Sequence, residues 1–207
     1  MRAARYVTVL IMALAVLVRF ALAQDPQRGR GGGGRGNAIA TMVLTTTAWP
    51  DGTLIPVKYS QAGDQVSPAL SWSNVPEGTV SFVLLFHDVD AAAGNGTDDV
   101  LHWLLWNIPG TATGLPEGVP QGDQLPDGTR QISVSGPYYR GPGAPSTGPT
   151  HHYAFELFAL DTMLSVQPAA QVPGVNPGVE TRGAVFRAMA GHVRGKAVYV
   201  GLFRRRS

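Results

Sequence analysis

Five polar side chains that can exchange protons stand at the ends of strongly apolar segments: Asp88, Asp90, His102, His151 and Tyr153. Side chains two residues apart on a strand share a face, so Asp88 would point with Asp90, and His151 with Tyr153. Two like charges at this spacing need a cation, hydrogen-bond donors, bulk water or a shared proton to offset their repulsion. If the three strand ends meet, the five side chains line one pocket.

These residue types are compatible with several kinds of site. Paired acids with histidines can act as general acids and bases, or form a two-histidine, one-carboxylate metal site. They can also be turn residues and core histidines with no ligand. The chain has no Cys and no G-x-S-x-G motif, Ser135 and Ser146 have no assigned base, and no histidine shows the local spacing of a dedicated metal motif. The residues therefore favour a binding protein without cofactor or resident metal over an enzyme.

The elements that must position these residues are short strands. The chain has 26 Gly and 16 Pro, and they separate runs of β-branched and aromatic residues. Strands are predicted at 39–47, 53–59, 70–73, 80–87, 102–108, 151–160 and 196–203. One helix is predicted near the end, because Asn176 can cap it, Pro177 fits its first position, and apolar residues at three-to-four spacing run to Gly191. The segment 110–149 reads as a long loop, and the domain is mainly β.

The first 37 residues differ from the rest. Arg2 and Arg5 precede an apolar stretch that ends before Arg19, and Ala21-Leu22-Ala23 resembles a cleavage site. The stretch is shorter than the roughly 20 residues that cross a bilayer, so residues 1–23 are predicted to be a signal peptide and not a transmembrane anchor. Residues 24–37 form a Gly/Arg-rich flexible linker before a domain at 38–207. We expect an exported protein, either periplasmic or secreted, that is not transmembrane after processing.

The charge distribution argues against a nucleic-acid partner. The net charge is +2 and the pI about 9.2, but from Ala38 onward 10 basic residues face 13 acidic ones. The Arg-Gly stretch in 24–37 is interpreted as a solvated linker. The terminal Arg204 to Arg206 are interpreted as charges that keep the last strand soluble, with an anionic membrane surface as the alternative. Asp98 and Asp99 are interpreted as a solvated loop.

Five segments in order resemble the phosphatidylethanolamine-binding protein family, in particular its bacterial, Raf kinase inhibitor-like branch. They are SPALSW (67–72), FHDVDA (86–91), HWLLWNIPG (102–110), GPGAP (141–145) and HHYAFELFALD (151–161). The resemblance covers about residues 40 to 203. It implies a β-sandwich-like fold of two antiparallel sheets with one or two peripheral helices, and a small anion pocket at one end.

The resemblance also implies roles for individual residues. The family's D-P-D-A-P motif falls on 88–92, its strand-opening His on His102, its G-P-P-type loop on 141–145 and its H-R-Y on 151–153. The carboxylates would hold the histidines as donors or accept from a ligand amine; His102, the loop amides and the Tyr153 hydroxyl would bind phosphate oxygens. The implied ligand-binding residues are Asp88, Asp90, His102, Gly141, Pro142, Gly143, Pro145, His151 and Tyr153.

The chain departs from this family pattern at several positions. Val89 and Ala92 stand where the first motif has proline, Ala144 replaces a proline of the pocket loop, and His152 replaces the arginine of H-R-Y. The segment AAAGNGTDD is an insertion. Losing prolines removes the rigidity of a fixed φ, so we expect a pocket mouth more flexible than the family norm.

Three hypotheses about function follow. The first is an exported protein that binds a small anion, such as phosphate or a phospholipid head group. The second is a protein-interaction or protease-inhibitor module, for which a protein partner would be needed. The third is a metal-assisted hydrolase, which would need a bound metal ion.

Overall fold

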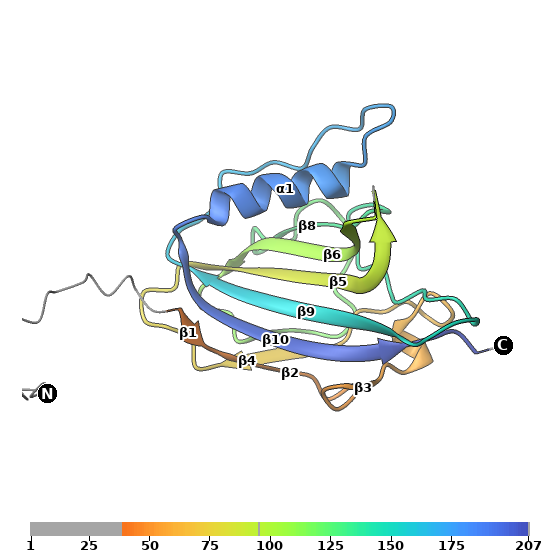
Figure 1. Cartoon of the computed structure of the whole chain (residues 1–207). Helices are drawn as coiled ribbons and strands as arrows, with labels where there is room; N and C mark the ends of the chain where they lie inside the picture. The colour runs from red at the N-terminus through yellow and green to blue at the C-terminus, as the bar shows by residue number, and fades with distance from the viewer. Residues whose placement is uncertain (1–38, 95, 207) are drawn as a thin grey trace, which may run out of the picture. The chain divides into compact units, whose positions relative to one another are not determined.

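The computed structural model describes residues 39–94 and 96–206, so the predicted signal peptide and linker lie outside the described residues. Strands and one α-helix follow in this order (Figure 1): β1 (Ala40–Thr41), β2 (Val43–Thr45), β3 (Thr53–Leu54), β4 (Leu70–Ser73), β5 (Ser81–Ala93), β6 (Asp98–Pro109), β7 (Gly114–Leu115), β8 (Arg130–Ile132), β9 (His151–Leu160), α1 (Pro177–Met189) and β10 (Val193–Phe203). A 3₁₀ turn, η1 (Val57–Tyr59), follows β3.

The strands form two sheets. The large sheet has the order β1-β10-β9-β5-β6-β8, with β3 also paired to β10, and the small sheet has the order β2-β4-β7. The long strands β5, β6, β9 and β10 pair antiparallel, while the short β1 and β3 run parallel to β10. The predicted mainly β fold with two sheets and a peripheral helix is confirmed, and its large sheet is mixed at the β10 edge.

Strand β5 shows why its sequence is continuously apolar. Phe82, Leu84 and Phe86 belong to the core between the two sheets, whereas Val83 and Leu85 belong to a second core beneath α1. Figure 1 shows α1 on the face of the large sheet opposite β2 and β4. A strand buried on both faces has no position for a polar residue, so SFVLLF lacks the alternation of a half-exposed strand.

The predicted helix is confirmed with its cap. The Asn176 side chain accepts hydrogen bonds from the backbone N–H groups of Gly178 (2.9 Å) and Val179 (3.3 Å), and Pro177 opens the helix. No helix in the described part of the chain is long and apolar enough to cross a membrane.

Several strand bounds differ from the prediction. The predicted strand 39–47 is two short strands, because the chain leaves the large sheet after β1 and joins the small sheet as β2. The predicted strand 53–59 ends at Leu54, since Pro56 has no N–H for a ladder and precedes the 3₁₀ turn. The predicted loop 110–149 contains β7 and β8.

Candidate functional site

A small open cavity lies at one end of the large sheet, where β5, β6 and β9 meet the loop 140–145. Its volume is about 160 Å³. A water molecule occupies roughly 30 Å³ of the liquid, so the cavity has room for a few waters or one small anion. Its lining residues are Gln61, Asp88, Ala91, Val100, His102, Arg140, Gly143, Ala144, Pro145, His151 and Tyr153.

Asp88 fixes the orientation of His151 at this cavity. The Asp88 side chain is only 5% exposed, and its Oδ2 accepts a hydrogen bond from Nδ1 of His151 at 2.9 Å. Strands β5 and β9 bring the two residues together, since Asp88 pairs with Tyr153 in the sheet register. With Nδ1–H directed at the carboxylate, Nε2 of His151 has no partner among the described residues. This nitrogen donates to a ligand when the ring carries both protons and accepts when it carries one.

His102 is held in one tautomer. Its Nδ1 lies 2.8 Å from the carbonyl oxygen of Arg140 and 3.0 Å from that of Gly141, so Nδ1 must carry a proton to donate. Burial, together with the nearby Arg140 charge, lowers the pKa of the His102 imidazole to about 4. A neutral ring in this tautomer carries a lone pair on Nε2, so His102 would donate to a phosphate oxygen only when the ring carries both protons.

Tyr153 braces the pocket loop. Its hydroxyl oxygen accepts hydrogen bonds from the backbone N–H groups of Gly143 (3.2 Å) and Ala144 (3.0 Å). Burial and the neighbouring Asp88 carboxylate raise the pKa of the Tyr153 phenol, so it remains protonated. The N–H groups of Gly143 and Ala144 are therefore already engaged by Tyr153, whereas these two bonds do not use the O–H proton of the phenol.

The remaining loop residues divide between the lining and its support. Gly143 and Pro145 line the cavity, whereas Gly141 and Pro142 act through their carbonyl groups. The carbonyl oxygen of Gly141 accepts a hydrogen bond from Nε2 of Gln61 at 2.8 Å. The carbonyl oxygen of Pro142 accepts one from the backbone N–H of Gln61 at 2.9 Å. A Cβ at position 141 would come within 2.5 Å of the Tyr59 carbonyl oxygen, so only glycine permits this approach of the two loops.

Asp90 is separated from the cavity, contrary to the prediction. The side chain of Asp88 folds the backbone after it, because its Oδ1 accepts from the N–H groups of Asp90 (3.1 Å) and Ala91 (3.2 Å). The β5–β6 register shifts just beyond Asp88, so the two-residue period ends there. Asp90 instead accepts from Nδ1 of the exposed His152 at 2.8 Å, and hydrogen bonds from His152 lower the pKa of Asp90.

Arg140 is a lining residue that the sequence analysis did not identify. It stands between Tyr139 and Gly141 in a Gly- and Pro-rich segment, where a single arginine gives no pattern. Its backbone carbonyl accepts the hydrogen bond from His102, and its charge contributes to the lowered pKa of that imidazole. The guanidinium forms no hydrogen bond or ion pair with any described residue, whereas Asp88 at the same cavity is paired.

This arrangement can bind a small ligand. Among the described residues it offers a cation without a counter-ion, two imidazole nitrogens without partners and a paired carboxylate, around a space for a small molecule. No described serine or threonine joins a histidine in the lining, as a nucleophile would. Within residues 39–94 and 96–206, no group of three His, Cys, Asp or Glu side chains is placed to hold a metal ion.

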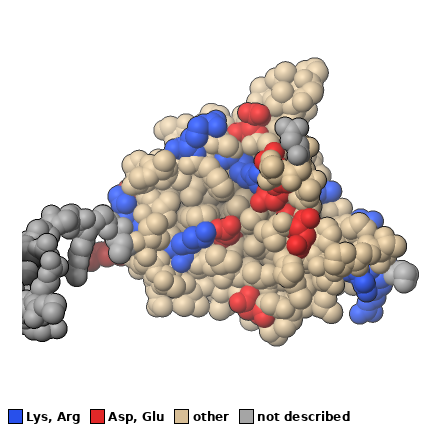
Figure 2. All heavy atoms as spheres, in the orientation of Figure 1, with Lys and Arg blue, Asp and Glu red and all other residues tan. Residues whose placement is uncertain are grey.

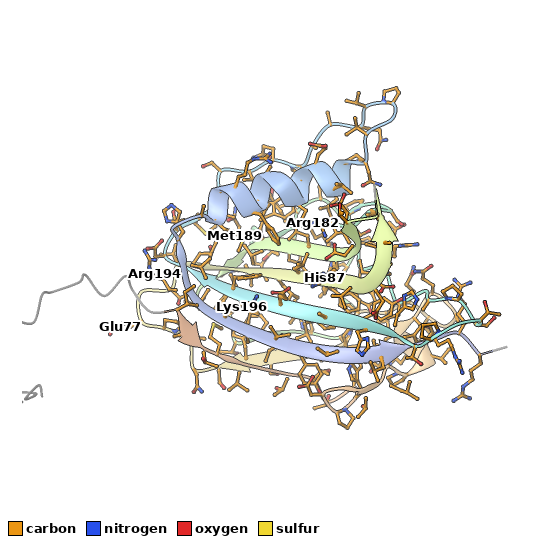
Figure 3. All side chains as sticks on the ribbon, in the orientation of Figure 1. Glu77, His87, Arg182, Met189, Arg194 and Lys196 are labelled. Atoms are coloured by element: carbon orange, nitrogen blue, oxygen red, sulfur yellow. The ribbon has the colours of Figure 1, made fainter. Side chains whose placement is uncertain are left out.

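A second cluster of charges lies on the opposite face of the large sheet. We call it the ionic ladder; it consists of Lys196, Glu156, His87, Asp99 and Arg182. His87 joins its two halves, with Nδ1 at 2.5 Å from Asp99 and Nε2 at 3.1 Å from Glu156. Arg182 binds the other oxygen of Asp99, and Lys196 the other oxygen of Glu156. Figure 3 shows that Lys196, His87 and Arg182 follow one another from β10 across the sheet to α1.

The ladder corrects one further expectation. Asp99 is not a solvated loop residue, because it is held between His87 and Arg182. Hydrogen bonds from His87 and Arg182 lower the pKa of Asp99 to about 2, although burial opposes this change. Hydrogen bonds to Asp99 and Glu156 raise the pKa of His87 to about 9, again against the effect of burial. Figure 2 shows basic and acidic side chains interspersed on this face, except near the C-terminus, where basic side chains gather.

Comparison with known proteins identifies relatives in sequence and in fold. The family model described as phosphatidylethanolamine-binding protein matches residues 45–204. A UPF0098 protein of Methanothermobacter thermautotrophicus is 42% identical over 166 residues, which cover 79% of this chain and 99% of that protein. Two crystal structures superpose with a TM-score of 0.64: a phosphatidylethanolamine-binding protein homologue, CT736, from Chlamydia trachomatis (29% identity; 80% of this chain, 98% of that chain) and YbcL of Escherichia coli (25%; 80% and 99%).

Proposed function

Because the chain belongs to the phosphatidylethanolamine-binding protein family, we propose that it is a binding protein whose cavity takes a small phosphate-like anion. The observation that carries the proposal is Arg140, which lines the 160 Å³ cavity and whose guanidinium has no carboxylate partner among the described residues. A cation close to a small cavity and free of a counter-ion favours an anionic ligand there.

The other lining groups support the same ligand. Asp88 engages Nδ1–H of His151, which leaves Nε2 of His151 for a ligand atom. The Asp88 charge itself is satisfied by His151 and by backbone N–H groups, so it repels an anion less than a bare carboxylate would. The cavity volume is far below the roughly 300 Å³ of the smallest drug-sized pockets, so the bound part of the ligand is small.

We further propose that the protein works outside the cytoplasm. The support is the sequence of residues 1–23, with two arginines, a short apolar stretch and an A-x-A site. Mass spectrometry of the protein from its native host, with a mature N-terminus at or near Gln24, would agree with export; an intact Met1 in cell extracts would contradict it.

The anion proposal is tested by calorimetric titration with inorganic phosphate. We expect wild-type protein to bind phosphate and the Arg140→Gln variant to bind it at least about tenfold more weakly, because a charge-assisted contact is lost. Arg187→Gln is the matched control, since Arg187 is an exposed arginine of α1 and its loss changes the net charge equally. No binding by wild type, or equal losses in the two variants, would refute the proposal.

A further inference from the structure

The outward side of α1 carries two large apolar side chains that the fold leaves exposed. The helix packs on the large sheet through its buried residues, which include Thr181, Val185 and Met189. On the opposite side Val179 is 42% exposed and Phe186 is 40% exposed. These two residues are seven positions apart, which is close to two turns of 3.6 residues, so they lie on one stripe of the helix.

Gly183 lies on the same stripe, in the middle of the helix Pro177–Met189. Glycine is the least favourable residue in a helix interior after proline, so its place there needs a reason. Gly178 has one, because a Cβ there would come within 2.5 Å of the Ser133 carbonyl oxygen. A Cβ at position 183 would meet only the tip of the flexible Arg187 side chain, at 3.2 Å. The packing of the chain itself does not require this glycine, whereas close approach of a second helix would.

Two opposite charges flank Gly183 along the stripe. Glu180 comes three residues before it and Arg187 four residues after it; both are exposed, and neither pairs with a described residue. If a two-fold axis passed close to Gly183, Glu180 of one copy would lie beside Arg187 of a second copy, and the pair would occur twice. A parallel helix pair would instead bring like charges together, which opposes association.

The apolar surface continues beyond both ends of α1. At the C-terminal end, Phe186 and Met189 line an open apolar groove of about 480 Å³ together with Phe158 and Val193. At the N-terminal end, the loop 163–176 has no charged residue and projects beyond the first turn of the helix (Figures 1 and 2). An antiparallel arrangement of two copies places the loop of each copy at the end of α1 where the other copy has its groove.

We propose that α1 is the interface of a homodimer, in which two copies pack this helix antiparallel about a two-fold axis at Gly183. Glu180 of each copy then pairs with Arg187 of the other, and Val179 of each packs near Phe186 of the other. Because the same surface is used on both copies, the association closes at two. No residue of α1 lines the cavity at the end of the large sheet, so this inference does not rest on the anion proposal.

Cross-linking tests the two-fold axis. The chain has no cysteine, so a single introduced thiol reports one contact. We expect Gly183→Cys to form a disulfide-linked dimer under mild oxidation, since the axis brings the two Cα atoms to less than about 7 Å. Ala190→Cys is the matched control: this exposed residue lies on the same stripe, about 10 Å along the helix from position 183, so its two thiols would be about 20 Å apart. Absence of linkage in Gly183→Cys, or equal linkage of both variants, would overturn the proposal.

Charge reversal tests the pairing. By sedimentation equilibrium of the purified protein we expect a monomer–dimer equilibrium, and Glu180→Arg or Arg187→Glu should raise the dimer Kd at least about tenfold through two like-charge contacts. The double variant restores both pairs with reversed signs, and its Kd should return to within about threefold of wild type. Asp64→Arg is the control, because this exposed acid in the turn after η1 changes the net charge equally and should leave the Kd unchanged.

Two results of this experiment would refute the dimer. One is a wild-type protein that stays monomeric up to its solubility limit. The other is a double variant, folded by circular dichroism, that associates no better than the single variants. The second result would mean that Glu180 and Arg187 serve only to complement the dipole of their own helix.

Discussion

The two faces of the large sheet carry the same residue types with opposite consequences. On one face the ionic ladder joins His87 to two carboxylates, and each carboxylate has a second basic partner. On the other face burial lowers the pKa of His102, and Arg140 lines the same cavity without an acidic partner among the described residues. His87 and Asp88 are neighbours in sequence, so a single strand supplies both arrangements.

This difference teaches how to distinguish a structural charge cluster from a binding site. In the ionic ladder every charged side chain is paired with another side chain of the protein, so a ligand could bind there only by breaking one of these ion pairs. At the cavity several polar groups have no partner within the described residues, and a small space adjoins them. A perturbed pKa is found in both clusters, so it does not by itself identify function.

The largest effect should come from removing the centre of the ladder. His87→Leu leaves Asp99 and Glu156 with one basic partner each beneath α1, and we expect the free energy of unfolding to fall by about 2–4 kcal/mol in urea denaturation. Phosphate affinity should stay within about twofold of wild type. A matched control is His192→Leu, since His192 is a half-exposed histidine paired with Asp161, and its loss should leave stability unchanged. A folded His87→Leu protein that no longer binds phosphate would abolish the distinction between the faces.

The pH dependence of stability should sharpen the comparison, because the two histidines act with opposite signs. The pKa of His87 is raised from 6.5 to about 9, so its contribution is complete below pH 6.5 and is lost as the pH rises through 9. The pKa of His102 is lowered to about 4, so the unfolded chain binds more protons between pH 6.5 and 4, and stability falls as the pH falls through that range.

Denaturation curves measured from pH 4 to 10 should therefore show a maximum near pH 6.5, with changes of about 1–3 kcal/mol on each side. The carboxylates of the ladder act mainly below this window, since the stabilisation from Asp99 and Glu156 begins to fall near their ordinary pKa values of 3.8 and 4.5 and is lost completely as the pH falls through about 2. His87→Leu should flatten the alkaline side and His102→Phe the acid side. The reverse assignment would show that the charge states of the two rings are exchanged.

The smallest effect is expected at Asp90, the acid that lies outside the cavity. Asp90→Asn removes a charge whose partner is the exposed His152, so phosphate affinity measured by calorimetry should change by less than about twofold. An equal loss of charge at Asp88, by Asp88→Asn, should change phosphate affinity clearly, because Asp88 sets the orientation of His151. If the two substitutions changed phosphate affinity equally, Asp90 would have to be counted among the ligand-binding residues.

The sequence predicts local structure well where one physical rule dominates. The bounds of β4 and β9 agree with the prediction because turn-forming residues flank each apolar run, and the α1 cap agrees because Asn176 and Pro177 each have a single good use there. The two-residue period also places His151 and Tyr153 together, since β9 is regular at these positions. It fails at Asp90 because the Asp88 carboxylate bends the backbone that the rule assumes to be extended.

What the sequence could not predict are contacts between distant segments. Arg140 lies 38 residues after His102, and only the folded loop brings the two residues to the same cavity. Asp99 meets His87 through the pairing of β5 with β6, and Arg182 meets Asp99 from a helix 83 residues later. The tautomer of His102 is set by two carbonyl groups of a loop that no sequence pattern identifies.

Because His87 and Asp88 are adjacent and face opposite sides of the sheet, β5 should not tolerate insertions or deletions of one residue before them. Deleting one residue from the buried part of β5 would turn each of the two side chains to the other face, with Asp88 placed beside Glu156 and Asp99, and Val89 placed where His151 needs a carboxylate. Insertions and deletions are therefore tolerated only beyond Asp88, toward the connection with β6. The segment AAAGNGTDD, which is longer than the family pattern, lies there.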